Sequence, residues 1–390
     1  MAIFDFLKKK DTRTTVTRTD IVTGNTSVFT TWTGGAYQND IYREGVDAIA
    51  RSVGKLKGTH IVDYGSTQKT TDGRLNRLFQ VQPNEYMNAF DLFYKLTTHL
   101  YLNNNAFALL DRDERGSVVA IYPITCTQAE FMEDQHGRLF VQFRFRNGKA
   151  FTFNYADVVH LKRNFNSNEL LGDDNGAIIP ALELAHTENE GIQNAIRSGA
   201  QIRGILKFTS IKNDTQLKQD KEQFIADYLD ISNNGGVVAI DNKTEYTPIE
   251  SKPVTVDPDQ TKETRLKIFN YLGISEKIVN ASYTEDEWQA FHELVIEPVA
   301  IQMSLEFTRK IFTEREMSFG NKIVFDSGRL MYSSNKTKLE LISTLIPYGI
   351  LTINQALEIL NLPPVADGDK RLQTLNMVDA EKANEYQLNT

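Results

Sequence analysis

The sequence predicts an α+β fold, and three observations lead to that prediction. Short strand-like stretches separated by turn residues fill residues 59–162, whereas helical periodicity dominates residues 257–312 and returns after residue 335. With 41% hydrophobic and 24% charged residues, the chain of 390 residues has the ordinary composition of a globular protein. Its length allows two or three structural units, each with its own core.

The first part of the chain predicts an arm, two helices and a series of strands. Residues 11–35 are rich in Thr, Gly and Asp and show little period, so we expect an extended or mobile arm. The next stretch places Val46, Ile49 and Val53 on one helical face, and Asn88 can cap the aromatic-rich helix that follows. Strands are expected at 59–63, 107–110, 118–121, 139–146, 150–154 and 157–162, with a hairpin turn at Asn147-Gly148.

A helix of unusual composition and a compact mixed segment come next. The helix expected at 177–198 has few large apolar residues, and Glu183, Glu188 and Glu190 stand against a lone Arg197. The mixed segment after it predicts strands at 205–208, 237–240 and 246–249 and a helix at 214–229.

Residues 257–312 predict a helix, an exposed loop and a long bent helix. Asp257 can cap the first helix, in which Leu266, Phe269 and Leu272 share one face because they recur at three-residue spacing. This helix is expected to end where a glycine stands in the position of a C-terminal cap.

The long helix has both a start signal and a bend signal. Thr284 and Glu287 have the spacing of a capping box. Pro298 lies inside the helix, and its missing N–H removes one backbone hydrogen bond, so we expect a kink between Leu294 and Pro298.

The end of the chain predicts one strand and two helices. Thr352 and Gln355 form a second capping-box pattern, and the polar tail after Arg371 is expected to be loose. The strand is expected at 322–325 and the helices at 335–346 and 353–361.

Composition also bounds the function. The net charge is −8, and no basic block is longer than the three lysines at 8–10, whereas proteins that grip DNA usually present basic clusters. The chain either never meets DNA or is a conduit whose neutral or acidic wall lets DNA slide. The single Cys126 excludes an internal disulfide and favours an intracellular setting. We expect no membrane span and no signal peptide.

The sequence offers no constellation for catalysis. The P-loop, dinucleotide-binding and nucleophile-elbow motifs are absent, and the six histidines are scattered. A calcium-loop pattern that begins at Asp111 is spoiled by Arg115 and Tyr122, and Asp173-Asp174 is typical of an exposed loop. We therefore expect no catalytic residue, no metal and no cofactor.

Several sequence segments, taken in order, resemble segments of the portal proteins of long-tailed phages. They run from about residue 40 to 375 and read VDAIARSVGKL, PNEYMNAFDLFYKLTTHLYLNNNAFALLDRDERGSVVAIYPI, DVVHLK, ISNNGGVVAIDNKTEYTPI and YGILTINQALEILNLPPVADGD. The helix, loop and bent helix at 257–312 resemble the stem helix, tunnel loop and kinked helix of that family. The chain departs from the family at the loop, which commonly has a Gly-Val-Pro turn and greater length but here reads GISEKIVNASYTEDEW.

The resemblance implies a portal-type α+β fold with a mixed α/β wing, a two-helix stem, a small α/β clip, a long kinked helix and a C-terminal helical crown. The expected boundaries are 1–35 for the N-terminal arm, 36–175 for the wing, 176–199 for the first stem helix, 200–256 for the clip, 257–273 for the second stem helix, 274–284 for the tunnel loop, 285–334 for the kinked helix and the return to the wing, 335–375 for the crown and 376–390 for a flexible tail.

The resemblance also implies a function. Portal proteins form a ring, usually of twelve subunits, at one capsid vertex of the virion, where DNA is packaged and ejected. The expected partners are further copies of the chain, double-stranded DNA held without sequence preference, the terminase large subunit, the head–tail adaptor and the major capsid or scaffold protein, with assembly in the host cytoplasm and no membrane contact.

Two sets of residues carry the implied contacts with the channel. The poorly apolar helix at 177–198 fits a stem helix that faces neighbours and channel water. The expected DNA-facing residues of the tunnel loop are Lys277, Asn280, Ser282 and Tyr283, and the expected channel-facing residues of the stem are Glu183, Glu188 and Glu190.

A protein of another class is the alternative, namely an enzyme that processes DNA or nucleotides in phage heads. Convergent acidic clusters or a phosphate-binding loop would favour the enzyme, and the sequence shows neither. Without the resemblance, residues 274–284 would read as an ordinary solvated loop. Annular particles in a negative-stain image would favour the conduit.

Overall fold

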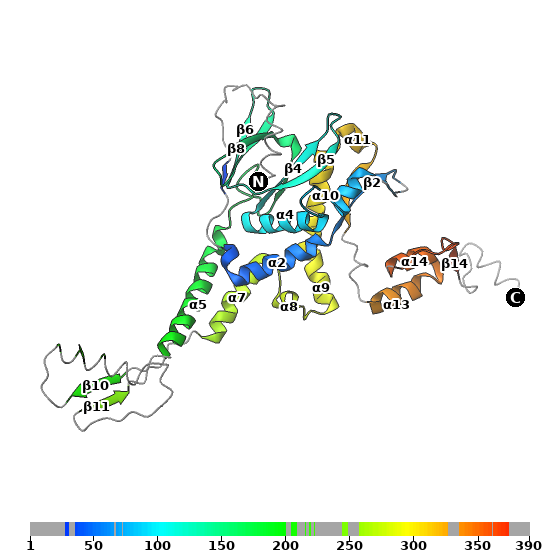
Figure 1. Cartoon of the computed structure of the whole chain (residues 1–390). Helices are drawn as coiled ribbons and strands as arrows, with labels where there is room; N and C mark the ends of the chain where they lie inside the picture. Colours follow the sequence, from blue (N-terminus) through cyan, green and yellow to red (C-terminus); the bar gives the residue numbers. More distant parts are fainter. Residues whose placement is uncertain are drawn as a thin grey trace, which may run out of the picture. The chain divides into compact units, whose positions relative to one another are not determined.

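The computed structural model divides the chain into two compact units (Figure 1). The first unit combines Met1–Gly176 with Phe269–Thr390, and the second is Ala177–Ile268. The structure describes residues 28–30, 36–65, 68–71, 73–199, 204–208, 215, 218–219, 222, 244–248, 257–326, 335–360 and 362–373.

Side-chain caps start α2 and α4, two of the N-terminal helices of the first unit. These elements are η1 (Ala36–Gln38), α2 (Asp40–Gly54), α3 (Arg74–Gln80) and α4 (Ala89–Asn103). The Asn39 side chain accepts a hydrogen bond from the Tyr42 N–H at 3.1 Å, and Asn88 forms a capping box with Asp91. Helices α2 and α4 pack against each other and bury their apolar faces.

The strands of the first unit pair antiparallel. They are β1 (Val28–Thr30), β2 (Lys57–Asp63), β3 (Gln68–Thr70), β4 (Asn105–Arg112), β5 (Val118–Ile124), β6 (Gln128–Glu133), β7 (Leu139–Arg144), β8 (Ala150–Asn154), β9 (Val158–Lys162) and β12 (Asn321–Asp326). Their orders are β1-β6-β7-β8, β12-β2-β3 and β5-β4-β9. Strand β12 pairs with β2 from Asn321↔Val62 to Asp326↔Lys57, which ties the late part of the chain to its beginning.

A run of helices connects the end of the second unit to β12. These elements are α7 (Pro258–Leu272), of which the last turn from Phe269 belongs to the first unit, α8 (Glu276–Val279), α9 (Glu285–Phe291), the π-helical turn η5 (His292–Ile296), α10 (Glu297–Ile311) and α11 (Glu314–Ser318). Capping boxes start α9 at Thr284 and α11 at Thr313.

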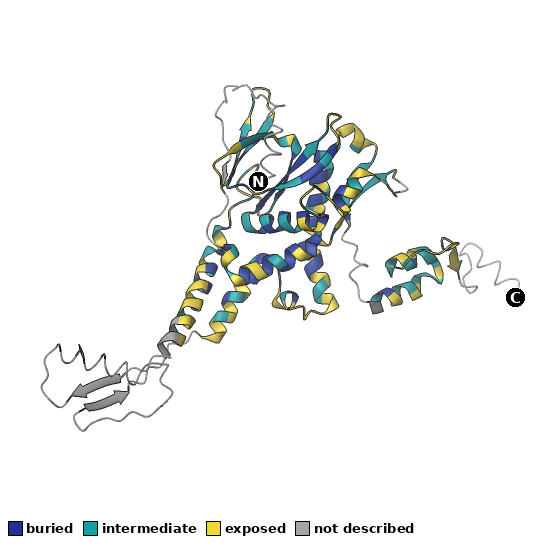
Figure 2. Cartoon of the chain, viewed as in Figure 1, coloured by how far each residue is buried: buried dark blue, intermediate teal, exposed yellow. Residues whose placement is uncertain are grey.

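Aromatic rings from four elements form the centre of the core around α10. Phe79 of α3 meets Phe307 of α10 edge to face with centroids 5.0 Å apart, and Phe93 of α4 meets Phe325 of β12 in the same way at 5.0 Å. All four side chains are buried. Figure 2 shows buried segments, in dark blue, in the part of the chain that holds the helices and strands of this core. Edge-to-face pairs add to the stabilisation that burial alone provides. This core therefore fixes α10 on the sheet that β12 and β2 form.

In its described residues, the C-terminal segment, defined here as residues 335–373, contains two helices and a two-stranded ladder. Its elements are α13 (Asn335–Leu345), β13 (Tyr348–Thr352), α14 (Ile353–Ile359) and β14 (Arg371–Gln373), and β13 pairs antiparallel with β14.

Two long helices and a two-stranded ladder lie in the part of the second unit that the structure describes. It contains α5 (Ile179–Gly199), which follows the turn η3 (Gly176–Ile178), α7 up to Ile268, β10 (Gly204–Phe208) and β11 (Thr244–Pro248). The ladder is antiparallel from Gly204↔Pro248 to Phe208↔Thr244.

Most sequence-based expectations for secondary structure agree with these bounds, and some do not. The two expected helices around 257–312 are present, but the loop between them contains the short helix α8. The link between the last two helices was expected to be a plain connection and contains β13. Helix α3 and strand β6 were not predicted. The helix expected at 214–229 and the strand expected at 237–240 fall largely outside the described residues.

Candidate functional site

The segment between α7 and α9 leaves the first helix through a left-handed glycine. Gly273 has φ +77°, and the next residue closes the helix end with a hydrogen bond from the Ile274 N–H to the Phe269 carbonyl oxygen at 3.0 Å. Ile274 and Ile278 are 4% and 7% exposed, so two apolar side chains anchor the segment. Only part of it is therefore free to face solvent.

A second left-handed residue reverses the chain after α8. Ala281 has φ +54°, which is uncommon for a residue other than glycine, and the Ser282 N–H donates to the Lys277 carbonyl oxygen at 2.9 Å. Asn280 ends the helix and Ser282 follows the reversal, both exposed. The tight turn presents these two polar side chains outward.

Glu287 connects this turn to the beginning of α9. Its Oε2 atom accepts a hydrogen bond from the Thr284 N–H at 2.8 Å, and its Oε1 atom forms an ion pair with the Lys277 ammonium group. The hydrogen bond from Lys277, followed by that from the Thr284 N–H, lowers the pKa of the Glu287 carboxyl. The Glu287 carboxylate therefore accepts hydrogen bonds from Lys277 on α8 and from Thr284 at the start of α9, and it neutralises the charge of Lys277.

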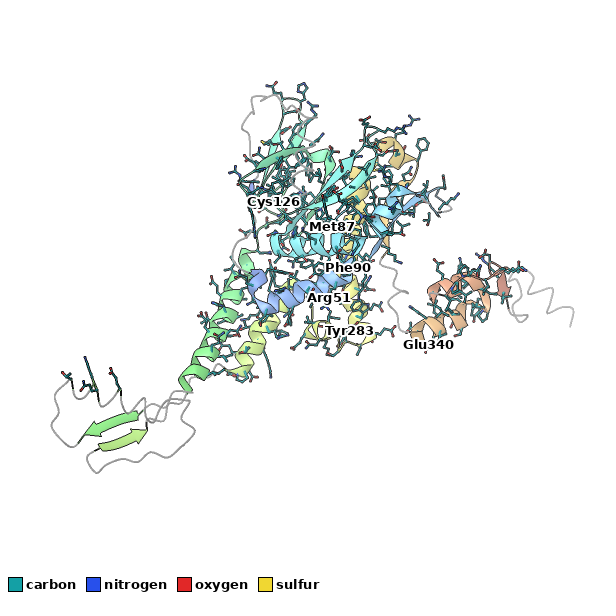
Figure 3. The ribbon with its side chains drawn as sticks, viewed as in Figure 1. Arg51, Met87, Phe90, Cys126, Tyr283 and Glu340 are labelled. Atoms are coloured by element: carbon teal, nitrogen blue, oxygen red, sulfur yellow. The ribbon has the colours of Figure 1, made fainter. Side chains whose placement is uncertain are left out.

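An aromatic pair closes the same turn. The Tyr283 ring stacks on Trp288 with centroids 5.0 Å apart and 29° between the ring planes, and Trp288 in turn contacts Phe291 at 5.5 Å. Tyr283 remains 39% exposed, and Figure 3 shows its side chain near α8 and α9. Trp288 thus supports Tyr283.

The structure places all four residues that we predicted as DNA-facing on this one segment, and each is exposed. Lys277 differs from the expectation in one respect, because it lies on α8 and not in an open loop. Its partner Glu287 was recognised from the sequence only as a capping residue. The spacing of ten residues between them gave no signal of contact, because the intervening chain reverses twice.

A π-helical turn lies in the long helix near the predicted bend. Hydrogen bonds in η5 span five residues, as in the bond from the Glu297 N–H to the His292 carbonyl oxygen. Pro298 has no N–H to offer the Leu294 carbonyl oxygen, so the wider turn before it accommodates the missing bond. The predicted kink region overlaps this turn, which begins two residues earlier than predicted.

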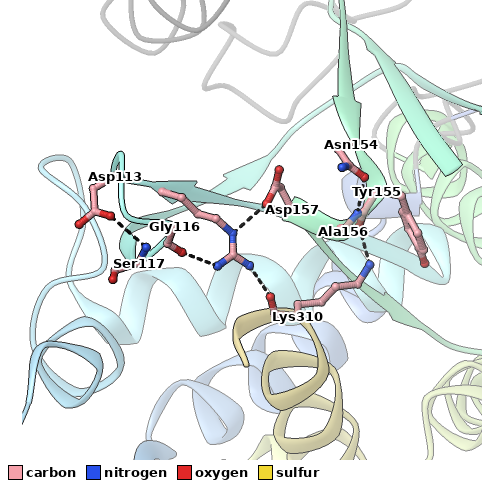
Figure 4. Close-up of polar contacts among 9 residues, drawn as sticks. Asp113, Gly116, Ser117, Asn154, Tyr155, Ala156, Asp157 and Lys310 are labelled. Carbon is pink, nitrogen blue, oxygen red and sulfur yellow. Dashed lines mark hydrogen bonds and ion pairs between the residues drawn. The ribbon is translucent and has the colours of Figure 1, made fainter. Parts of the chain in front are cut away.

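Charged side chains fix the C-terminal end of α10 to the strands (Figure 4). The Arg112 guanidinium group donates to Asp157 Oδ1 at 2.8 Å, to the Gly116 carbonyl oxygen at 2.8 Å and to the carbonyl oxygen of Lys310. The Lys310 ammonium group donates to the Tyr155 carbonyl oxygen and lies 3.6 Å from the centroid of the Tyr155 ring. Helix α10 thus ends in a defined position.

Burial makes this anchor sensitive to protonation. Lys310 is 8% exposed, and burial lowers the pKa of its ammonium group to about 8 although Glu306 opposes the shift. His160 is 2% exposed, and burial holds its pKa well below the ordinary value. Its backbone N–H donates to Glu306 Oε1 at 3.2 Å, so β9 and α10 share one buried polar network.

The predicted acidic residues of α5 do not behave as one set. Glu183 and Glu190 are exposed. Glu188 is 6% exposed and accepts a hydrogen bond from the Thr264 hydroxyl of α7 at 2.9 Å. The prediction that Glu188 faces a channel does not fit this geometry, because the contact turns its carboxylate toward the neighbouring helix.

The described part of the chain offers neither a cluster of metal ligands nor a membrane-spanning helix. Within the described ranges, no three His, Cys, Asp or Glu side chains are arranged to hold a metal ion. None of the helices described here has the length and apolar character needed to cross a membrane.

Comparison with known proteins defines the class of the protein. The structure of a neck protein from a native gene transfer agent particle, computed with C12 symmetry, superposes with a TM-score of 0.61 at 14% identity and covers 85% of this chain and 92% of that one. A portal protein of the HK97 family from Corynebacterium diphtheriae superposes with a TM-score of 0.50 at 13% identity, over 78% and 98% of the two chains. The fold is therefore a portal-type α+β fold.

Sequence comparison gives the family. The family model described as phage portal protein matches residues 41–361, so the chain belongs to the phage portal protein family. The probable portal protein of Lactococcus phage p2 is 24% identical over 205 residues, which cover 50% of this chain and 54% of that protein. The chain spans about half the length of the curated relatives it matches at this level.

Proposed function

We propose that this protein forms a ring at one capsid vertex and serves as the channel through which DNA is packaged and ejected. The observation that carries the proposal is the family match across residues 41–361. The superposition on a neck protein computed with C12 symmetry supports a ring and makes twelve copies the expected number. The ring would belong to the virion, after assembly in the host cytoplasm.

An apolar stripe on the long helix also supports self-assembly. It consists of Leu294, Pro298, Ile301 and Leu305, all exposed, with exposed fractions of 72%, 52% and 67% for Leu294, Ile301 and Leu305. Their spacing of four, three and four residues puts them on one side of the helix. The opposite side is in the core, through Met303 and Phe307. A helix that is apolar on both sides is usually covered on both sides.

The regions keep the boundaries expected from the sequence. We assign the wing to 36–175 and 285–334, the stem to 176–199 and 257–273, the clip to 200–256 and the crown to 335–375. The separate compact unit at Ala177–Ile268 supports an assignment of stem and clip to one body. The clip would dock the terminase large subunit and later the head–tail adaptor, and the outer surface would meet the major capsid or scaffold protein.

The DNA-facing residues are assigned to the segment between α7 and α9. Lys277, Asn280, Ser282 and Tyr283 are exposed there, which supports a contact with passing DNA. Because Glu287 neutralises Lys277, the contact would be weak, as a sliding polymer requires. Glu183 and Glu190 would face the channel from the stem. The protein would act as a structural conduit and not as an enzyme.

Purified protein tests the proposal directly. Negative-stain images and mass measurements in solution should show annular particles with a closed number of copies, and empty capsids built with these rings should package DNA when terminase and ATP are added. A protein that stays monomeric at high concentration and hydrolyses DNA or ATP would overturn the proposal and restore the enzyme alternative.

A further inference from the structure

We propose that a polar cluster around Asn175 positions the segment between α7 and α9, because it fixes the last turn of α7 to the end of α4 and to β9. The inference rests on the proposed function, since this is the segment that would face DNA. The polar cluster consists of Asn104 at the end of α4, Arg163 directly after β9, Asn175 before α5 and Tyr271 in the last turn of α7. All four residues belong to the first unit.

Asn175 makes as many hydrogen bonds as a side-chain amide can usually make. Its Oδ1 atom accepts from the Tyr271 hydroxyl at 2.6 Å and from the Asn104 amide at 2.8 Å. Its Nδ2 atom donates to the carbonyl oxygens of Tyr101 at 3.1 Å and Leu102 at 2.7 Å. The residue is 1% exposed, so protein groups replace water around it. Four bonds in four directions allow the amide one orientation.

Arg163 holds the same helix end from another element. Its guanidinium group donates to the Tyr271 carbonyl oxygen at 2.7 Å, one of the carbonyls for which the end of a helix has no N–H. A positive charge is also favourable at this pole of a helix. The guanidinium group lies 4.6 Å from the centroid of the Tyr101 ring and 5.2 Å from that of Tyr271. The Arg163 N–H donates to the Asn104 carbonyl oxygen at 2.9 Å, which fixes the arginine backbone.

Close backbone packing keeps the loop before Asn175 in place. A Cβ atom at Gly172 would lie 2.2 Å from the Arg163 carbonyl oxygen and 2.5 Å from the Asn104 carbonyl oxygen. The Gly172 N–H donates to Asn105 Oδ1 and the Asn105 amide donates to the Gly172 carbonyl oxygen, both at 3.0 Å. Only glycine allows this approach, which brings the loop and its Asn175 side chain to the end of α4.

The polar cluster stands directly before the segment that would face DNA. Tyr271 is two residues before Gly273, whose left-handed conformation ends α7. Both the hydroxyl and the carbonyl oxygen of Tyr271 are bonded to residues outside α7, so the helix end cannot turn without breaking one of these bonds. The direction in which the chain leaves α7 is therefore set by Asn175 and Arg163.

Apolar burial alone would hold the helix end without orienting it. Phe269 and Leu272 are 1% and 2% exposed, so the last turn of α7 is already packed. Hydrogen bonds add a narrow range of distance and angle, which apolar contacts do not require. A segment that meets moving DNA at a fixed distance needs that orientation, and this need accounts for a buried amide in place of an apolar side chain.

Hydrogen exchange of the full-length protein tests the positioning directly. Tyr271→Phe removes the hydroxyl and keeps the ring beside Arg163, and exchange of residues 273–282 would be followed by mass spectrometry. Amides in this range are hydrogen-bonded in the parent protein, for example those of Ile274 and Ser282. We expect their exchange to become faster by about tenfold, because a lost buried hydrogen bond releases the helix end.

Tyr155→Phe is the matched control. It also removes a tyrosine hydroxyl, which lies 3.1 Å from His160 Nδ1 in another partly buried network. Exchange of residues 273–282 should stay at the parental rate in this variant.

A double variant tests whether the two partners act through one bond. Asn175→Ala should speed exchange of residues 273–282, and adding Tyr271→Phe to it should change little, because the shared bond is already lost. Effects of the two substitutions that simply multiply would overturn the bond between Asn175 and Tyr271 as the cause.

Retention of DNA separates positioning from stability. Tyr271→Phe rings should form and package DNA, but they should lose packaged DNA faster than parent rings, because a loose turn keeps no steady contact with the duplex. Tyr155→Phe rings should retain DNA like the parent protein, even where the two variants lower the thermal midpoint equally.

The outcomes distinguish this inference from the proposed function. Parental exchange of residues 273–282 in Tyr271→Phe would overturn the inference alone. Faster exchange with parental retention of DNA would also overturn it, because the polar cluster would then stabilise the fold without positioning a contact. Equally fast exchange in Tyr155→Phe would show general loosening and would reject the cluster as the cause. Parent chains that never form rings or package DNA would overturn the proposed function and this inference together.

Discussion

At the scale of single residues, Lys277 is the side chain whose role changes most once the structure is known. The sequence alone suggests a ring of free positive charges, but the ammonium group is paired with Glu287. Lys277 is exposed and Glu287 is partly exposed, so the pair contributes little to folding. The Lys277–Glu287 pair instead sets the local charge that passing DNA would meet. With both residues present, that net charge is close to zero.

The first prediction follows from that pairing. Lys277→Ala should leave ring assembly and the thermal midpoint nearly unchanged, because an exposed ion pair is lost. It should weaken retention of packaged DNA, more strongly at low salt, because each subunit would present an uncompensated Glu287 to the phosphates. Packaging and retention assays at two salt concentrations measure the effect.

Arg138→Ala is the matched control, since Arg138 is an exposed residue paired with Asp134 on the β6–β7 hairpin. It should retain DNA like the parent protein. If Lys277→Ala and Lys277→Glu rings also retain DNA like the parent at low salt, then Lys277 does not face DNA.

Lys310 gives the second residue-scale prediction, which concerns pH. The pKa of the Lys310 ammonium group is about 8 in the folded chain and near 10.5 in the unfolded chain. At a pH between these two values, the unfolded chain therefore binds more protons than the folded chain. The contribution of Lys310 to the free energy of unfolding therefore rises as the pH increases from about 8 to about 10.5. The free energy of unfolding of the parent relative to Lys310→Met should rise by about 2 kcal/mol from pH 7.5 to 9.5.

Urea titrations at several pH values in that range measure the difference. Lys262→Met serves as the control, because Lys262 is an exposed lysine on α7 and its difference from the parent should stay flat. A flat difference for Lys310→Met would mean that the folded chain does not disfavour the charged form of Lys310.

At the scale of secondary-structure elements, the sequence predicted those parts that local chemistry decides. The capping boxes at Thr284 and Thr352 and the glycine turn at Asn147-Gly148 were recognised because their signals lie within four residues. Helix α8 was missed because four residues are too few to show a period. The burial of Glu188 could not be predicted either, since its partner Thr264 is 76 residues away in the chain.

The turn before Pro298 combines one feature that the local sequence predicts with one that depends on tertiary packing. A π-helical turn lies next to the place where Pro298 predicted a kink, because the lost hydrogen bond is a local property. The π-helical form of the turn depends on tertiary packing as well, since His292, Val295 and Ile296 are all buried. Sequence alone carries no signal for that packing.

The apolar stripe yields the element-scale prediction. Ile301→Glu and Leu305→Glu change exposed positions, so each should alter the free energy of unfolding of a single chain by no more than about 0.5 kcal/mol. Each should nevertheless reduce ring formation by tenfold or more in an assembly titration, because an apolar interface would bury an unpaired charge, at a cost of about 1.4 kcal/mol per tenfold.

Phe319→Glu provides the control, because Phe319 is 63% exposed at the end of α11 and is not part of the stripe. It should assemble like the parent protein. Normal rings from Ile301→Glu together with Leu305→Glu would show that the outer side of α10 lies outside the subunit contacts.

At the scale of the whole molecule, the division into two units is what gives the fold its proposed function. The first unit holds the large aromatic core, the bent helix and the exposed turn around Ala281. The second unit has two helices linked by the Glu188–Thr264 hydrogen bond, together with the β10–β11 ladder. On the proposed assignment, the second unit would carry the docking surface and the first unit the exposed turn.

The ladder makes a precise deletion possible. Phe208 and Thr244 are the last pair of the β10–β11 register, so an Asn-Gly turn can join them directly in place of residues 209–243. The shortened chain keeps the ladder, α5 and α7. We expect it to remain folded and to form rings, because the aromatic core of the first unit and the β10–β11 ladder are both retained.

The shortened protein should fail to dock the packaging motor, since the removed residues would form most of the clip. Binding of the terminase large subunit to preformed rings, measured by co-sedimentation, tests this expectation. A variant that replaces the exposed residues Lys218 and Glu222 by alanine within the intact chain serves as a partial control, which should bind at least as well as the deletion. Normal motor binding by the shortened ring would reject the clip as the docking site and would move the search to the two helices that remain.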